Sequence, residues 1–169
     1  MINRRSFITG IKSFNLSKKE KIFLHKYKPW GVILFSRNIR SINQAKKLTI
    51  EIRKIFNDKY YPILLDQEGG RINRLKNFFH TDELTGEYFG NLYLKDKKKF
   101  NNDYKIFIKK TSLILKRIGI NINTVPVLDI RKKGSSNVIG DRSFSNNPGT
   151  IDKIGNFCIN FFHKNKIGT

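Results

Sequence analysis

PILLDQEGGRINR, residues 62–74, joins a short apolar run to a polar turn that holds two adjacent glycines. A short apolar run bounded by turn-forming residues is typical of a strand buried on both faces, as in a parallel sheet. Two glycines allow the following backbone to turn sharply and to approach a ligand closely. We therefore predict a buried strand over 62–66 and a tight loop directly after it.

The chain alternates between helical and extended patterns on both sides of this strand. Ser17 and Glu20 have the spacing of a capping box, which opens a helix that Pro29 ends. The predicted strands are 6–11, 31–35, 62–66 and 120–130, and 166–169 resembles the opening of another. The predicted helices are 17–28, 41–55, 85–94, 102–118 and a last one that carries Ile151, Ile154, Cys158, Phe161 and Phe162.

Two local predictions concern the middle of the chain. Residues 95–99 are rich in lysine and are expected to form a solvated turn. In the helix over 102–118, an apolar stripe is expected from the helical spacing, and Gly119 is a typical C-terminal stop. The stripe consists of Ile106, Leu113, Ile114 and Ile118.

Alternating strands and helices with short connections predict an α/β fold with parallel strands and right-handed crossovers. Two architectures fit this order, an open doubly wound sheet and a (β/α)8 barrel of the TIM type. A GxGxxG phosphate fingerprint follows none of the predicted strands, so nothing supports a dinucleotide-binding sheet. Because a full barrel needs about 250 residues, the 169 residues predict one domain, 1–169, that is the N-terminal portion of a barrel.

Polar residues at the carboxyl ends of parallel strands are the candidate site, because functional groups collect at that edge. Asp66 ends one strand, Asp129 ends the next, and Arg142 lies in the loop after it. Arg71 and Arg74 add planar donor groups suited to hydroxyl pairs or carboxylates.

Less specific interpretations of these residues stay open at this stage. Asp66 could cap a loop, because Asp is a common turn former. Glu68 could pair with Arg71 or with a neighbouring loop. Arg142 could be a surface arginine, or it could form a salt bridge with Asp129 or Asp141. Asp66 and Glu68 are poor candidates for the two carboxylates of a glycosidase, because residues two apart in a turning loop rarely face each other across a ligand.

Composition excludes several classes of protein. The net charge of +21 is spread over all predicted helices and loops, which favours a solvated surface over a specific nucleic-acid site. No apolar run reaches the length of a membrane helix. The three histidines lack the spacing of metal ligands. The single cysteine, Cys158, lies on the apolar face of the last helix and is expected in the core.

Four blocks together resemble the bacterial β-N-acetylhexosaminidases of glycoside hydrolase family 3. They are GVILFSRN at 31–38, LLDQEGGRINRL at 64–75, INTVPVLDI at 122–130 and GDRSFSNNP at 140–148. Their order and spacing follow the family over nearly the whole chain. The resemblance implies a TIM-like barrel and a retaining glycosidase that removes terminal N-acetylglucosamine from peptidoglycan fragments during cell-wall recycling in the cytoplasm.

The resemblance also assigns residue roles. Asp66 is expected to hold sugar hydroxyls, and Arg74 and Arg142 to line the same sugar site. The implied partner is a small carbohydrate, a muropeptide that contains N-acetylglucosamine, and no cofactor, metal, specific nucleic acid or membrane is expected. The oligomeric state is not indicated.

The family's Lys-His-x-Pro-Gly-His-Gly block, acid/base loop and nucleophile do not occur by Thr169, so no catalytic residue is expected within this chain. The chain is therefore expected to be a piece of a longer enzyme. The alternatives are a non-catalytic sugar-binding remnant and, with less support, a basic polyanion-binding protein.

We predict that residues 1–169 alone do not hydrolyse p-nitrophenyl N-acetyl-β-D-glucosaminide, because glycoside hydrolysis needs two suitably placed acid, base or nucleophilic groups. The assay is p-nitrophenol release by the purified polypeptide. Turnover that co-purifies with the polypeptide would contradict the prediction.

Overall fold

The computed structural model describes residues 4–132, 134 and 137–169. The strands are β1 (Arg5–Gly10), β2 (Pro29–Leu34), β3 (Ile63–Leu65) and β4 (Ile122–Asn123). The helices are α1 (Lys18–Tyr27), α2 (Ile42–Phe56), α3 (Gly86–Lys95), α4 (Lys97–Ile118) and α5 (Pro148–Lys164), with short 3-10 turns at Ser36–Asn38 and Gly140–Arg142. No helix in the described ranges is long and apolar enough to cross a membrane.

The four strands form one parallel sheet in the order β1-β2-β3-β4. This confirms the α/β class and the parallel sheet. The sheet is open rather than closed on itself, so the barrel stays a prediction. The expected strand at 166–169 is present only as a single parallel bridge between Ile122 and Gly168.

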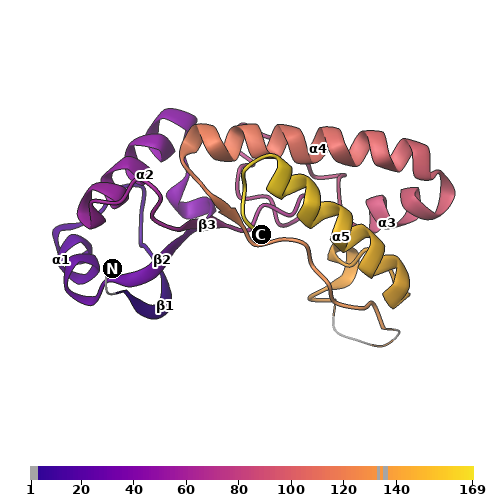
Figure 1. Cartoon of the computed structure of the whole chain (residues 1–169), viewed down its shortest axis with the longest axis horizontal. Coiled ribbons are helices and arrows are strands. Elements are labelled where there is room, and N and C mark those ends of the chain that lie inside the picture. The colour runs from indigo at the N-terminus through magenta and orange to yellow at the C-terminus, as the bar shows by residue number, and fades with distance from the viewer. Residues whose placement is uncertain (1–3, 133, 135–136) are drawn as a thin grey trace.

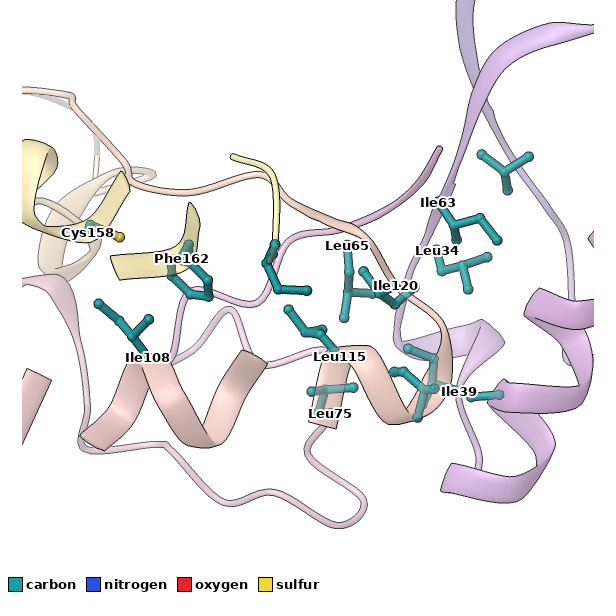
Figure 2. Close-up of a cluster of buried hydrophobic side chains, with 14 of the residues drawn as sticks. Leu34, Ile39, Ile63, Leu65, Leu75, Ile108, Leu115, Ile120, Cys158 and Phe162 are labelled. Carbon is teal, nitrogen blue, oxygen red and sulfur yellow. The ribbon is translucent and has the colours of Figure 1, made fainter. Parts of the chain in front are cut away.

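One face of the sheet builds the core. Val32 and Leu34 of β2 and Ile63 and Leu65 of β3 are fully buried among apolar side chains of α2 and α4. Figure 2 shows this core continuing from β3 past Leu115 of α4 to the α5 side chains. Cys158 is buried in it, as predicted.

Among the described residues, no helix packs on the opposite face of the sheet. The register pairs Ile33 with Leu64 and Leu64 with Ile122, so these three side chains point to the same side. They are not members of the core cluster, and Ile8, on the same face of β1, is 46% exposed. We call this surface the helix-free face.

The longest helix, α4, spans the molecule from α2 to α3, and α5 lies against it (Figure 1). The N-terminal half of α4 joins α3 and α5 through an aromatic cluster. The cluster consists of Phe89, Phe100, Tyr104, Phe107, Phe144 and Phe157. The cluster fixes the connection that follows β4, because Phe144 belongs to that connection.

Three local predictions were wrong. Residues 97–99 belong to α4, because the Asp96 side chain accepts from the Lys99 amide and caps the helix. Ile106 and Leu113 are more than half exposed, because the face of α4 that packs is set by Tyr104, Phe107 and Leu115.

The third error concerns the strand predicted over 120–130, which is reduced to the two residues of β4. Pro126 has no amide hydrogen, and the Val125 amide donates locally to the Asn123 carbonyl, so the ladder ends there.

Helix α3 packs against the chain around Phe144 at backbone distance. A Cβ on Gly90 would lie 1.7 Å from the Phe144 carbonyl oxygen, and one on Gly86 would lie 2.1 Å from that of Arg142. Glycine at these positions therefore serves close packing.

We predict that Gly90→Ala lowers the free energy of unfolding by about 2 kcal/mol, because overpacking against backbone costs more than helix propensity returns. Chemical denaturation measures this. Asn91→Ala, on an exposed position of the same helix, is the control and should not destabilise. Equal stability of the two variants would contradict the packing argument.

Candidate functional site

Three strand ends bring Phe35, Asp66 and Thr124 to one edge of the helix-free face. Ile33, Leu64 and Ile122 are register partners, and each of the three residues lies two positions further along its chain. Side chains two apart in extended backbone point to the same side. The Thr124 amide donates to the Leu65 carbonyl at 2.9 Å, which continues the ladder to this point.

Asp66 is the anionic centre of this edge. Its Oδ2 accepts from Arg74 Nη2 at 3.1 Å, and its Oδ1 accepts from the Thr124 hydroxyl. The Arg74 guanidinium also lies over the Phe35 ring, 5.5 Å from its centroid. The Asp66 side chain is 21% exposed and that of Arg74 is 25% exposed. The pair is thus oriented by neighbours and remains open to a ligand.

The backbone behind Asp66 is fixed by one buried side chain. Asn123 Oδ1 accepts from the Gln67 amide at 2.9 Å, and Asn123 Nδ2 donates to the Gln67 carbonyl at 3.1 Å. Both residues are almost fully buried. The Gln67 side chain in turn accepts from the amides of Arg74 and Leu75 at 2.9 and 3.2 Å. The loop therefore closes back on β3 and brings Arg74 beside Asp66.

The two glycines of the loop have a structural purpose. Gly69 and Gly70 have φ values of +99° and +54°, in the region that favours glycine. A Cβ on Gly69 would lie 2.3 Å from the Leu84 carbonyl oxygen, and one on Gly70 would lie 2.7 Å from Thr85 Cγ2. The close approach that these glycines make is to the chain that leads into α3, and their close approach to a ligand stays a prediction.

Glu68 and Arg142 form a bidentate ion pair across 74 positions of sequence. Arg142 Nε and Nη2 donate to the two Glu68 oxygens at 2.9 and 2.7 Å. The Arg142 side chain is 23% exposed and the Glu68 side chain is 12% exposed. The hydrogen bonds to Glu68 raise the pKa of Arg142 above its ordinary value, and the negative charges of Glu68, Asp129 and Asp66 add to this. Arg142 therefore lies within the field of Asp66.

Residues 6–169 match the model of the glycosyl hydrolase family 3 N-terminal domain. The chain belongs to this family. The β-hexosaminidase of Hydrogenovibrio crunogenus is 34% identical over 153 residues, which are 90% of this chain and 42% of that protein. The β-hexosaminidase of Neisseria gonorrhoeae is 32% identical over 154 residues, again 90% of this chain and 42% of the relative. The chain thus spans less than half the length of these family 3 relatives.

Solved structures of the family agree with the fold. NagZ from Neisseria gonorrhoeae in complex with N-trifluoroacetyl-D-glucosamine superposes with a TM-score of 0.86 at 29% identity, over 97% of this chain and 48% of that one. Native NagZ from the same organism gives a TM-score of 0.85. The resemblance to family 3 hexosaminidases seen in the sequence is therefore confirmed.

The geometry answers several of the open interpretations. Asp66 contacts Arg74 directly, and Arg142 reaches the same edge through Glu68. Glu68 pairs with the loop that follows β4, one of the two options considered, and its alternative partner Arg71 pairs with Asp141. The alternative salt bridge of Arg142 with Asp129 or Asp141 is not formed among the described residues, and the Arg142 guanidinium pairs with Glu68 instead. These contacts do not test the sugar-binding roles.

Sequence reasoning missed Phe35, Thr124, Gln67 and Asn123. A signal existed for Phe35, because it ends the predicted strand 31–35, whereas placing Thr124 at the same edge needs the register of the folded sheet. Asn123 lacked a signal, since an asparagine inside an apolar strand pattern looks like a turn former.

In the described part of the chain, no three His, Cys, Asp or Glu side chains form a group that could hold a metal ion. Burial raises the pKa of the Cys158 thiol to about 12, although its hydrogen bond with Tyr104 acts in the opposite direction. This thiol belongs to the core.

We predict that Asn123→Ala destabilises the fold by at least about 2 kcal/mol, because it leaves the buried amide and carbonyl of Gln67 unsatisfied, at roughly 1–3 kcal/mol for each group. Urea denaturation measures the change. Asn102→Ala removes the same side chain from an exposed position of α4 and is the control. A loss no larger than that of the control would show that the two hydrogen bonds contribute nothing to stability.

Proposed function

We propose that the protein carrying this chain is a β-N-acetylhexosaminidase that removes terminal N-acetylglucosamine, and that residues 1–169 supply part of its sugar-binding site. The observation that carries the proposal is the Asp66 carboxylate, held at a strand end by Arg74 and Thr124 and still one-fifth exposed. The family 3 relatives named β-hexosaminidase support the reaction class.

Asp66 suits a role in binding sugar hydroxyls. A carboxylate accepts hydrogen bonds from two neighbouring hydroxyl groups, and charged acceptors make the stronger bonds. The adjacent guanidinium groups of Arg74 and Arg142 supply donors to ring and hydroxyl oxygens. Because the three groups are fixed by partly buried hydrogen bonds and ion pairs, little ordering is needed when a sugar binds.

Residues Asp66 and Glu68 do not fit the pair of groups that breaks a glycosidic bond. Both Glu68 oxygens are bound to Arg142, so Glu68 has no oxygen free to protonate a leaving group. Asp66 is bound to Arg74. We therefore place the acid, the base and the nucleophile of a retaining reaction outside these residues.

The finer proposals follow from the resemblance to family 3. The helix-free face and the open sheet would be enclosed if the strands continued into a TIM-type barrel, with the Asp66 edge at its mouth. The substrate would then be a peptidoglycan fragment that carries terminal N-acetylglucosamine, cleaved with retention in the cytoplasm. The NagZ structure with N-trifluoroacetyl-D-glucosamine supports an N-acylated amino sugar as the ligand class.

The test is the kinetics of Asp66 variants in the full protein that carries this chain, with p-nitrophenyl N-acetyl-β-D-glucosaminide as substrate. Asp66→Ala should lower kcat/KM by roughly 10- to 150-fold, because a charged hydrogen bond is worth about 1.5–3 kcal/mol. Asp66→Asn should lose less, because its amide oxygen still accepts one bond. Asp82→Asn, in an exposed loop, is the control and should leave kcat/KM unchanged.

Other outcomes separate the alternatives. Loss of turnover by several orders of magnitude in both variants would make Asp66 the nucleophile. An unchanged kcat/KM with a lower Tm would leave it only a loop cap and would remove the sugar-binding assignment. Sugar binding by a wild-type protein without turnover would indicate a non-catalytic remnant.

A further inference from the structure

Arg71 is not among the proposed sugar ligands, yet it makes four hydrogen bonds to a distant segment. Its Nη2 donates to three consecutive carbonyl oxygens, those of Asn137, Val138 and Ile139, at 2.7, 2.6 and 3.0 Å. Its Nε donates to Asp141 Oδ1 at 2.9 Å. Three backbone carbonyl groups of one turn thus accept hydrogen bonds from one guanidinium group. Arg71 therefore contacts the backbone of the turn as well as a carboxylate.

The segment that Arg71 holds is the 137–142 turn, and it presents Arg142. The Arg142 amide donates to the Ile139 carbonyl at 2.9 Å, and Arg142 Nη1 donates to the Val138 carbonyl at 3.3 Å. Arg71 and Arg142 therefore share the Val138 oxygen. Two guanidinium groups this close repel each other, and the Glu68 and Asp141 carboxylates offset that repulsion.

The other side of the 137–142 turn is fixed by packing. The backbone of Arg142 and Phe144 lies against Gly86 and Gly90 of α3, where a Cβ would be only 2.1 and 1.7 Å from their carbonyl oxygens. Arg142 thus lies between the segment that packs on α3 and residues 137–139, which Arg71 holds. A substitution of Arg71 should therefore loosen residues 137–139 and leave the packing on α3 in place.

Charge attraction alone does not account for this arrangement. The Arg71 and Asp141 side chains are 43% and 37% exposed, and an exposed ion pair contributes little to stability. One planar guanidinium contacts the three carbonyl oxygens through Nη2 and the Asp141 carboxylate through Nε, so two nitrogens in a fixed geometry hold the turn together. A lysine ammonium keeps the charge but not the fork.

We propose that Arg71 is a positioning residue: it orders the 137–142 turn so that Arg142 faces the sugar bound at Asp66. The inference rests on the proposed function, since it gives Arg71 a role through a sugar-binding arginine. It also makes residues 68–71 and 137–142 one unit, in which Glu68 orients the guanidinium of Arg142 and Arg71 orients its backbone.

The first measurement reads the turn itself and needs no activity. In the full protein that carries this chain, Arg71→Lys and Arg71→Gln should speed amide hydrogen exchange in peptides that cover 137–143, because the Ile139 carbonyl that accepts from the Arg142 amide is no longer held by Arg71. Exchange elsewhere should not change. Arg40→Lys, at an exposed arginine whose backbone alone is hydrogen-bonded to Gln44, is the matched control. Unchanged exchange in 137–143 would overturn the inference, even if activity fell.

The second measurement is a double-mutant cycle on KM for p-nitrophenyl N-acetyl-β-D-glucosaminide. Arg71→Lys should raise KM roughly tenfold in the wild-type background, on the scale of one displaced hydrogen-bonding group. In an Arg142→Ala background the same change should have almost no effect, because Arg71 then has no arginine to position. Asp141→Asn keeps an acceptor for Arg71 and should change KM less than Arg71→Lys does.

The failures can be told apart. An equal effect of Arg71→Lys in both backgrounds would show that Arg71 contacts the sugar or acts on overall stability, and it would overturn the inference while the proposed function stands. If the wild-type protein neither binds nor cleaves the glucosaminide, the proposed function fails and the role of Arg71 in sugar binding fails with it. The exchange data would then still report whether Arg71 holds the turn.

Discussion

The paired hydrogen bonds between the Asn123 side chain and the Gln67 backbone are the constraint on which the candidate site depends. They act where β3 and β4 stop exchanging backbone hydrogen bonds, so a side chain takes over from the ladder. Because these groups are buried, the two hydrogen bonds must be kept, since a buried amide or carbonyl without a partner costs free energy of folding. With the backbone of Gln67 fixed, the Asp66 carboxylate must leave the sheet on the helix-free face, and the following loop must return beside it.

Among the described residues, the charged side chains beside Asp66 form three ion pairs. Asp66 binds Arg74, Glu68 binds Arg142 and Asp141 binds Arg71. Removing one member of the two less exposed pairs, Asp66 with Arg74 or Glu68 with Arg142, leaves the other charge partly desolvated and alone, so these two pairs resist rearrangement. The result is a set of donors and acceptors with defined positions before any ligand arrives. A sugar site needs such fixed positions, because hydrogen bonds to hydroxyl groups depend on direction as well as on charge.

The sequence was sufficient for the class of fold and for the strand end that carries the candidate site, because both follow from local patterns. Apolar runs that end in Asp66 marked the strand and its carboxyl edge, and Ser17 with Glu20 marked a helix start that the structure confirms. The exposed side of α4 was misjudged, because Ile106 and Leu113 have the right spacing but their neighbours Tyr104 and Phe107 meet the aromatic cluster. The pairing of Glu68 with Arg142 was left undecided, because contacts across 74 positions depend on the tertiary fold. Asn123 could not be recognised for the same reason.

The central claim is that an N-acetylglucosamine residue binds at the Asp66 edge of the helix-free face. The most direct measurement is a crystal structure of the full protein that carries this chain, grown with N-acetylglucosamine. The account predicts sugar hydroxyls within hydrogen-bonding distance of the Asp66 carboxylate and of the Arg74 and Arg142 guanidinium groups, with the pair of Glu68 and Arg142 intact. A sugar bound at another place on the chain, with Asp66 still contacting only Arg74 and Thr124, would contradict it.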